Sequence, residues 1–195
     1  MRAALWIAAL VVALAGCSVD VDTSGMPGCA PPANGLNSTL VLIAQSVPTA
    51  SQLPCVRAVP VGWEFGDLRA GNGGAKFQLI ASREQSQEVV VELRDECDVS
   101  GATKLSSQNP GIRRFERITE SGSAYVGERY YVYEGGCTTY RFDLPGPDGG
   151  QTLNTVAGSL GFVSRQTLSQ QVHDHSDGRL ELDPSPSAAA SGGEA

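Results

Sequence analysis

The chain lacks the short motifs by which many enzymes are identified. It contains no GxSxG, HExxH, SxxK, GxxxxGKS or GxGxxG pattern, and its five cysteines form no CxxC unit. These patterns place a nucleophile, a zinc ion, a phosphate-binding loop, a dinucleotide or a redox pair, so their absence removes the enzyme classes that depend on them. Paired carboxylates that are distant in sequence remain open as catalytic groups. The sequence therefore assigns no catalytic residue.

Positive charge is also scarce. The chain has 14 lysines and arginines against 21 aspartates and glutamates, and its net charge is −7 with neutral histidines. A nucleic-acid-binding surface needs a basic face, and none is evident in the sequence. The same acidic balance argues against adsorption to anionic lipid by charge alone. We therefore expect no nucleic-acid partner.

Two short segments contain side chains of the types that bind metals. His173-Asp174-His175 holds both histidines of the chain. Residues two apart on a helix do not face the same direction, so we interpret this segment as a solvated helix end. Asp95, Glu96 and Asp98 surround Cys97 without the spacing of an EF-hand loop, and we interpret them as a polar turn beside a disulfide. The sequence thus predicts no metal site and no cofactor.

The N-terminus has the pattern of an export signal. Arg2 precedes an apolar run from Ala3 to Ala15, which is shorter than the about 20 residues of a membrane span. The run ends in Leu14-Ala15-Gly16-Cys17, which resembles the lipobox of bacterial lipoproteins. This resemblance implies a signal peptide over residues 1–16 and a diacylglycerol on Cys17, with a further acyl group such as palmitate on its amine in many bacteria. An ordinary cleaved signal, with Cys17 as a chance cysteine, is the alternative.

The other cysteines are even in number once Cys17 carries lipid. Cys29, Cys55, Cys97 and Cys137 can form disulfide bonds in several connectivities, as is usual in exported proteins. We predict the pairs Cys29 with Cys55 and Cys97 with Cys137. The first two flank one N-terminal segment, and the second two lie at the ends of predicted strands.

Composition divides the mature chain into three parts. Residues 17–35 are rich in Asp, Thr, Ser, Gly and Pro, and we predict that they form a flexible tether behind the acylated cysteine. Residues 36–182 have the size of a single domain. Residues 183–195 are of low complexity, and we predict a disordered tail.

Strand signals dominate the domain. Asn37 or Ser38 can cap a short helix over residues 39–46, although a buried strand fits that segment almost as well. Segments rich in β-branched and aromatic residues then alternate with turns, of which Gly71-Asn72-Gly73-Gly74 is the clearest hairpin loop. The predicted strands cover residues 63–68, 75–81, 88–94, 112–119, 125–133 and 138–144.

After residue 150 the period of the apolar residues changes. They recur every three or four positions, which indicates one or two helices, at Leu153, Val156, Leu160, Val163, Leu168 and Val172. The expected fold is α+β: an antiparallel meandering sheet of about five or six strands, with the C-terminal helices packed on one face.

Arginines on the predicted strands are the most suggestive polar feature. With nearby tyrosines they can form a surface that binds a carboxylate, a phosphate or an acidic sugar. Glutamates such as Glu116 and Glu128 are interleaved with them, so cross-strand ion pairs explain the same residues with fewer assumptions. The candidate anion-binding residues are Arg113, Arg117, Arg129, Arg141, Tyr131 and Tyr133, with Arg114 in the same group of arginines.

The sequence favours a non-enzymatic lipoprotein on the extracytoplasmic face of a bacterial cell membrane. Its acyl chains contact the bilayer, and its domain presents a sheet face or a loop to a membrane or cell-envelope protein. An envelope-acting hydrolase with carboxylate catalysis and a binder of a small anionic ligand are the alternatives. Leu53-Pro54-Cys55-Val56 and Val61-Gly62-Trp63 also resemble small uncharacterised extracytoplasmic proteins of high-GC Gram-positive bacteria, a resemblance that implies no activity.

Overall fold

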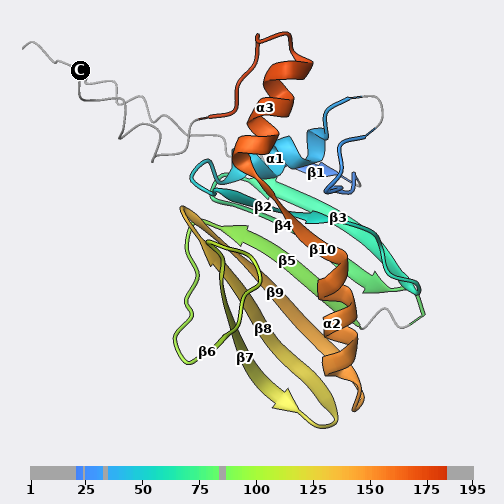
Figure 1. The fold of residues 1–195 in the computed structure, drawn as a ribbon. Coiled ribbons are helices and arrows are strands. Elements are labelled where there is room, and N and C mark those ends of the chain that lie inside the picture. Colours follow the sequence, from blue (N-terminus) through green and yellow to red (C-terminus); the bar gives the residue numbers. More distant parts are fainter. Residues whose placement is uncertain (1–20, 24, 33–34, 84–86, 184–195) are drawn as a thin grey trace, which may run out of the picture.

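An eight-stranded antiparallel sheet forms most of the fold (Figure 1). The computed structural model describes residues 21–183 apart from 24, 33–34 and 84–86. The strand order is β1-β3-β4-β5-β9-β8-β7-β6. The strands are β1 (Val21–Thr23), β3 (Trp63–Gly71), β4 (Gly74–Ala81), β5 (Glu88–Arg94), β6 (Thr103–Leu105), β7 (Arg113–Ser121), β8 (Ala124–Tyr133) and β9 (Gly136–Pro145).

Two meanders meet in the middle of this sheet. Strands β3, β4 and β5 form one meander, and β7, β8 and β9 form the other. They join where β5 pairs with β9, so that Val91 lies opposite Tyr140. The expected meander is therefore interrupted once, because the chain leaves β5 for the far edge and returns through β7 and β8. This arrangement places β8 and β9 near the centre of the sheet.

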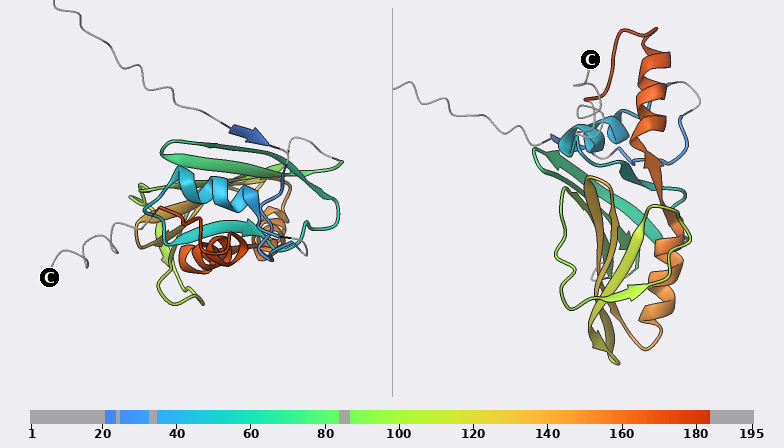
Figure 2. Two further views of the ribbon diagram at one scale, coloured as in Figure 1. Left: turned by 90° about the horizontal axis from the view of Figure 1, so that it is seen from above. Right: turned by 60° about the vertical axis from the view of Figure 1, so that its left-hand side comes forward.

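Helices and a two-stranded ribbon cover one face of the sheet (Figures 1 and 2). Helix α1 (Ser38–Ser46) contacts β3 and β4, and α2 (Gly149–Ser159) contacts β8 and β9. The ribbon pairs β2 (Gln52–Val56) with β10 (Leu160–Ser164), and β2 contacts β5. Helix α3 (Arg165–His175) packs on β10 and α1. We call the two sides of the sheet the covered face and the open face.

The core lies between the covered face and these elements. Alternate residues of the central strands point into it, and Phe77, Val91 and Tyr140 are at most 2% exposed. Leu40, Leu53 and other apolar side chains of α1, β2 and α2 close the core from the other side. Because side chains of a strand alternate between faces, the intervening polar residues are directed to the open face.

The predicted α+β class is confirmed, with more strands than expected. The predicted strands and the hairpin at Gly71–Gly74 are present. The helix at the N-terminal end of the domain is also present, and Asn37 accepts a hydrogen bond from Leu40 N at 3.1 Å, as an N-cap does. The helical interpretation of Leu160 and Val163 is wrong. These residues lie in β10, because pairing with β2 at Val56 and Leu53 overrides the apolar period.

Both predicted disulfides are present. Cys29 is bonded to Cys55 and Cys97 to Cys137, with Cα separations of 5.0 and 5.8 Å. The first bond holds the N-terminal segment against the end of β2, where Gly28 also forms a bridge with Val56.

The described part of the expected tether is attached to the domain. Val21–Thr23 pair with β3, and the Cys29 disulfide and the Gly28 bridge follow a few residues later. A segment of polar composition is held here by backbone pairing and one covalent bond, neither of which its composition reveals. Cys17, the predicted signal peptide and residues 184–195 of the predicted tail lie outside the described residues.

Candidate functional site

The predicted arginine and tyrosine group is divided between the two faces of the sheet. Arg129, Tyr131 and Tyr133 alternate along β8 on the covered face, where Arg129 contacts Asn154 of α2 at 3.3 Å. Arg117 and Arg141 lie on the open face, and both bind Glu128. Arg113 shares the side of Arg117, because the two are four residues apart on one strand. The six candidate residues therefore do not form a single site.

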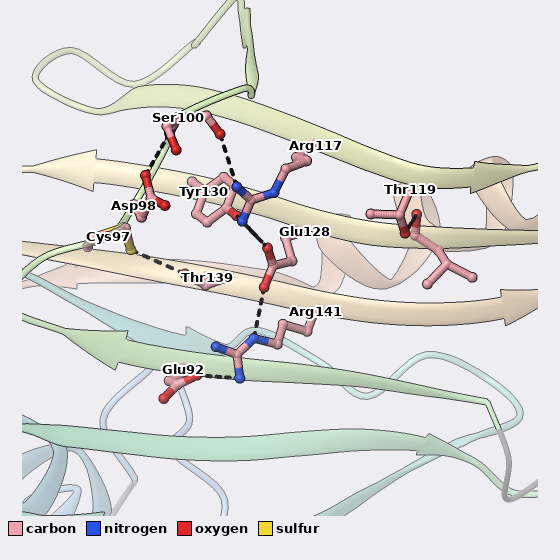
Figure 3. A network of polar contacts seen from close by, with 12 residues as sticks. Glu92, Cys97, Asp98, Ser100, Arg117, Thr119, Glu128, Tyr130, Thr139 and Arg141 are labelled. Atoms are coloured by element: carbon pink, nitrogen blue, oxygen red, sulfur yellow. Dashed lines mark hydrogen bonds and ion pairs between the residues drawn. A yellow bond between two sulfur atoms is a disulfide. The ribbon is translucent and has the colours of Figure 1, made fainter.

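An ion-pair network occupies the open face (Figure 3). Glu128 accepts hydrogen bonds from Arg117 at 2.6 Å and from Arg141 at 3.0 Å, and the Tyr130 hydroxyl donates to the same carboxylate. Arg141 also pairs with Glu92 at 2.9 Å, and Glu92 pairs with Arg94 at 2.6 Å. The predicted cross-strand ion pairs are confirmed, since β7, β8, β9 and β5 each contribute a member.

The network holds Glu128 in its ionised form. Burial alone would raise the pKa of Glu128, but hydrogen bonds from Tyr130, Arg117 and Arg141 outweigh it and lower the pKa. Burial and the bond to Glu128 together raise the pKa of Tyr130 to about 12. A carboxylate bound in this way neither donates nor accepts a proton readily near neutral pH.

Replacing Glu128 with Gln is expected to reduce the decrease in the free energy of unfolding that the wild-type protein shows in acid. The pKa of Glu128 is lower in the folded state than the ordinary value of 4.5. Its stabilisation is therefore complete above about pH 5 and is lost as the pH falls through the folded-state pKa. At pH 7 the loss of charged hydrogen bonds should lower the free energy of unfolding by about 2 kcal/mol. Urea unfolding between pH 7 and pH 2 measures both effects.

The control is Asp143→Asn, which removes an exposed carboxyl group on the same face of the sheet. If the free energy of unfolding changed with pH in the same way in the wild type and in Glu128→Gln, this role of Glu128 would be contradicted.

A pocket on the covered face gathers arginines from distant parts of the chain. It has a volume of about 290 Å³ and lies among β7, β8, α2, β10 and the loop before β7. None of the described residues that line it carries a carboxylate, although the net charge of the chain is −7. We call it the arginine pocket, and its principal residues are Arg57, Arg114, Arg129, Tyr131, Asn154 and Phe162.

Arg129 is held in place by side chains around the pocket. Its Nε lies 2.8 Å from a Glu116 oxygen and one terminal nitrogen lies 2.7 Å from the same oxygen. The hydroxyl of Tyr125 donates to the other oxygen of Glu116 at 3.3 Å. Arg129 is only 7% exposed. A buried guanidinium that is oriented in this way forms a rigid part of the pocket wall.

Arg114 and Arg57 have fewer contacts. The Nε of Arg114 is buried and has no hydrogen-bond partner within the described part of the chain. Such a donor is costly unless a ligand or water accepts its hydrogen. The guanidinium of Arg57 lies over Gly161, where a β carbon would come within 2.8 Å of its Nε, and it contacts the Gly158 carbonyl at 3.4 Å. The pocket thus has one fixed guanidinium and two that are available to an anion.

Aromatic rings form another part of the wall. The ring of Tyr131 packs against Tyr140 at 4.7 Å and Phe162 at 5.3 Å between centroids. Burial raises the pKa of Tyr131, and the nearby charges of Arg129 and Arg114 oppose this rise. The Tyr131 hydroxyl is therefore neutral at physiological pH and is close to both guanidinium groups.

The sequence revealed only part of this pocket. Arg129 and Tyr131 were predicted for an anion site, whereas Arg57, Asn154 and Phe162 were not. No local pattern marks these three residues, because each lies on a different element from the strands that carry the arginines. The glycines at 158 and 161 were visible in the sequence, but their role as space-making residues depends on what lies around them.

The two segments that contain metal-binding types of side chain lie at the end of a helix and in a polar turn. His173 and His175 are exposed in the last turn of α3. Asp95 and Asp98 accept hydrogen bonds from the backbone of Glu96 and Ser100, as residues of polar turns do. In the part of the chain that the structure describes, no three His, Cys, Asp or Glu residues are grouped as metal ligands would be.

Comparisons of the chain with models of protein families, with curated proteins and with solved structures find no significant match. Of the helices within the described residues, none has the length and apolar character needed to cross a bilayer.

Proposed function

We propose that the protein is a non-enzymatic, lipid-anchored binding protein on the extracytoplasmic face of a bacterial membrane, and that it takes up a small anionic ligand in the arginine pocket. One observation carries this proposal: three guanidinium groups line a cavity whose described lining has no carboxylate, in an acidic chain. Guanidinium groups match the geometry of carboxylates and phosphates, and a partly buried site strengthens the interaction.

The position of β1 supports a domain that is held close to the bilayer. Cys17 would carry the lipid, and the first strand begins at Val21. Four residues reach at most about 14 Å when fully extended. Two or three acyl chains make such an anchor stable, and confinement to a thin layer raises the effective concentration of the domain toward membrane neighbours.

The carboxylates of the strand region give little support to an envelope-acting hydrolase. Glu92, Glu116 and Glu128 each contact at least one guanidinium group. A glycosidase-type general acid needs a raised pKa, whereas the pKa of Glu128 is lowered. These carboxylates are therefore better suited to stabilising the fold through ion pairs than to transferring protons.

Thermal unfolding of the full-length protein in detergent tests ligand binding. Phosphate, acetate and benzoate are added as sodium salts at constant ionic strength, with chloride as the reference. At least one of them is expected to raise the Tm of the wild type, by mass action on the folded state. The Arg114→Gln variant should lose this response. Arg94→Gln, which removes an exposed arginine of the open face, should keep it. An equal Tm increase in the wild type and Arg114→Gln, or no response to any of the salts, would refute the pocket as the binding site.

Replacing Gly158 with Leu is expected to block the pocket without weakening the fold. Nothing lies within 4 Å of the position that a β carbon would take at Gly158, which lines the pocket near the end of α2. Leucine also favours the helix by roughly 0.5–1 kcal/mol relative to glycine. The variant should therefore show an unchanged or raised Tm and a weakened anion response. Gln151→Leu on the exposed side of the same helix is the matched control. An undiminished response in Gly158→Leu would show that the ligand binds elsewhere.

Replacing Cys17 with Ala tests the anchor independently. The wild-type protein is expected in the membrane fraction, and the variant, which has no thiol to acylate, in the soluble fraction. Immunoblotting of fractionated cells measures the distribution. Full retention of Cys17→Ala in the membrane fraction would contradict lipid anchoring and leave the pocket proposal untouched.

A further inference from the structure

Resting on the proposed function, we infer that the ligand of the arginine pocket is a ring compound that carries one carboxylate or phosphate group, and not a free inorganic ion. Its anionic group would bind Arg114 and the neighbouring guanidinium groups. Its ring would pack against the aromatic part of the wall at Tyr131 and Phe162. Three features of the pocket support this ligand: its hydrogen-bond donors, its aromatic rings and its volume.

The donors favour an oxyacid group. Arg114 lines the pocket, and its Nε is buried without a hydrogen-bond partner among the described residues. A guanidinium also carries two terminal nitrogens, and this pair of donors matches the oxygens of a carboxylate or a phosphate. A neutral ring would cover the guanidinium without supplying acceptors for these donors, which disfavours it. The anionic group is therefore required for binding.

The rings favour a ligand with a flat face. Phe162 is half-buried and packs on Tyr131 with a tilt of 55° between the ring planes. Both rings line the same cavity as the arginines. Aromatic pairs contribute beyond the area that they bury, and a ligand ring gains the same kind of contact. An inorganic ion would leave this apolar part of the wall in contact with water.

The size of the cavity agrees with a ring and one substituent. An apolar cavity of about 150 Å³ holds benzene, and sites for drug-sized ligands begin at about 300 Å³. The arginine pocket, at about 290 Å³, lies between these cases. The absence of a side chain at Gly158 leaves open space at the pocket, and the absence of one at Gly161 makes room for the guanidinium of Arg57. A ligand of roughly ten to fifteen heavy atoms would fill it.

Titration calorimetry of the full-length protein in detergent tests the inference with matched probes. Benzoate is compared with acetate, and phenyl phosphate with inorganic phosphate, so that the members of each pair share the anionic group and only one of them carries a ring. Glucuronate provides a ring acid without aromatic character, and benzyl alcohol provides a ring without charge. The ring-bearing member of at least one pair is expected to bind at least tenfold more tightly than its partner. Benzyl alcohol should bind at least tenfold more weakly than benzoate.

Two variants separate the ring contact from the anion contact. Phe162→Leu is expected to reduce the preference for the ring-bearing probe to about threefold or less while leaving the affinity for acetate or phosphate within threefold of wild type. Arg114→Gln should weaken both members of each pair about tenfold or more. Gly158→Leu, which occupies the space without removing a packed ring, is the second variant in case Phe162→Leu lowers the Tm. It should weaken the ring-bearing probes more than the small ions.

These experiments separate a failure of the ring-bearing ligand from a failure of the proposed anion-binding function. Equal affinity of the wild type for benzoate and acetate and for both phosphates, with binding that depends on Arg114, would overturn the ring and leave an anion-binding pocket. Binding of benzyl alcohol as tightly as benzoate would overturn the anionic group. Preference for glucuronate over benzoate would identify a sugar acid as the ring. If the wild-type protein bound none of the probes, the proposed anion-binding function of the pocket would be refuted.

Discussion

Replacing Arg165 with Met is expected to lower the free energy of unfolding by about 3–5 kcal/mol. Arg165 is the first residue of α3 and is only 6% exposed. Its Nε donates to the carbonyl of Ala50 at 2.8 Å, and one terminal nitrogen donates to the carbonyls of Ala44 and Val47 at 2.6 and 2.7 Å. Methionine fills a similar volume but removes the donor to the carbonyls of Ala44 and Ala50, whereas the carbonyl of Val47 still accepts a hydrogen bond from Ala50 N.

The position of the guanidinium explains the size of the effect. The last carbonyls of a helix have no partner within the helix and carry the negative end of its dipole. Arg165 satisfies two such groups at the end of α1 and a third in the turn that leads to β2. Burial lowers the pKa of Arg165, and the charge of Asp183 opposes this effect. The side chain therefore connects α3, α1 and the start of the ribbon through backbone carbonyls.

Urea unfolding of the full-length protein in detergent measures the change. Arg165→Lys should give an intermediate loss, because lysine keeps the charge but cannot reach several carbonyls in the planar geometry of a guanidinium. Arg179→Met is the control, since it loses only an exposed ion pair with Asp177 of 3.8 Å and one hydrogen bond to the Ser176 carbonyl, and it should change stability by less than about 1 kcal/mol. A loss below about 1 kcal/mol in Arg165→Met would show that water replaces the guanidinium at little cost.

Removing the disulfide between Cys97 and Cys137 by double substitution with Ala is expected to cost about 4 kcal/mol. The bond closes a chain segment with a sequence separation of 40 and attaches the β5–β6 connection to the start of β9. In the chain-entropy model most of this cost arises in the unfolded state, which gains freedom when the cross-link is absent. The loss should therefore appear mainly as a lower urea midpoint.

The second disulfide provides an internal comparison. Cys29 and Cys55 have a sequence separation of 26, and loop-closure entropy changes only slowly with loop length. The loss of stability on double substitution of Cys29 and Cys55 should therefore differ by no more than about 0.5 kcal/mol from the loss for Cys97 and Cys137. Adding reductant to either double variant should cause a further loss, because the other bond remains. Wild-type stability that is indifferent to reductant would contradict both predictions, as would a titratable thiol at Cys97 or Cys137 in the native protein.

Local signals were sufficient for most of the secondary structure. Period-two alternation predicted β8 and β9, and in β9 it follows burial, since Tyr140, Phe142 and Leu144 are buried while Arg141 and Asp143 between them are exposed. Asn37 or Ser38 was the predicted N-cap of this helix, and Asn37 fills that position, since an N-cap requires only its own side chain and the next backbone amides. The disulfide pairing was predicted from the N-terminal segment that Cys29 and Cys55 flank and from the strands that Cys97 and Cys137 adjoin. The same rules failed at β10, where an apolar repeat of helical period joined a ribbon with β2.

The candidate site could be predicted only in part. The sequence placed glutamates within reach of several arginines, but it grouped as one candidate surface the arginines that the structure divides between two faces. It did not state which strands are neighbours, and the pairing of β5 with β9 is what brings Glu92 to Arg141. Arg57, Asn154 and Phe162 reach the pocket from a loop, a helix and the ribbon, so no spacing in the sequence relates them.

The amino-acid sequence by itself determined the cysteine framework, the α+β class and the positions of most strands, and it is the basis for predicting an export signal. Each of these depends on interactions between residues close in sequence or on composition. The tertiary structure alone decided the order of strands, the strand at β10, the division of the arginines between two faces and the existence of the arginine pocket. These depend on which distant segments pack together, because a cavity is formed by side chains whose proximity is set by the whole fold.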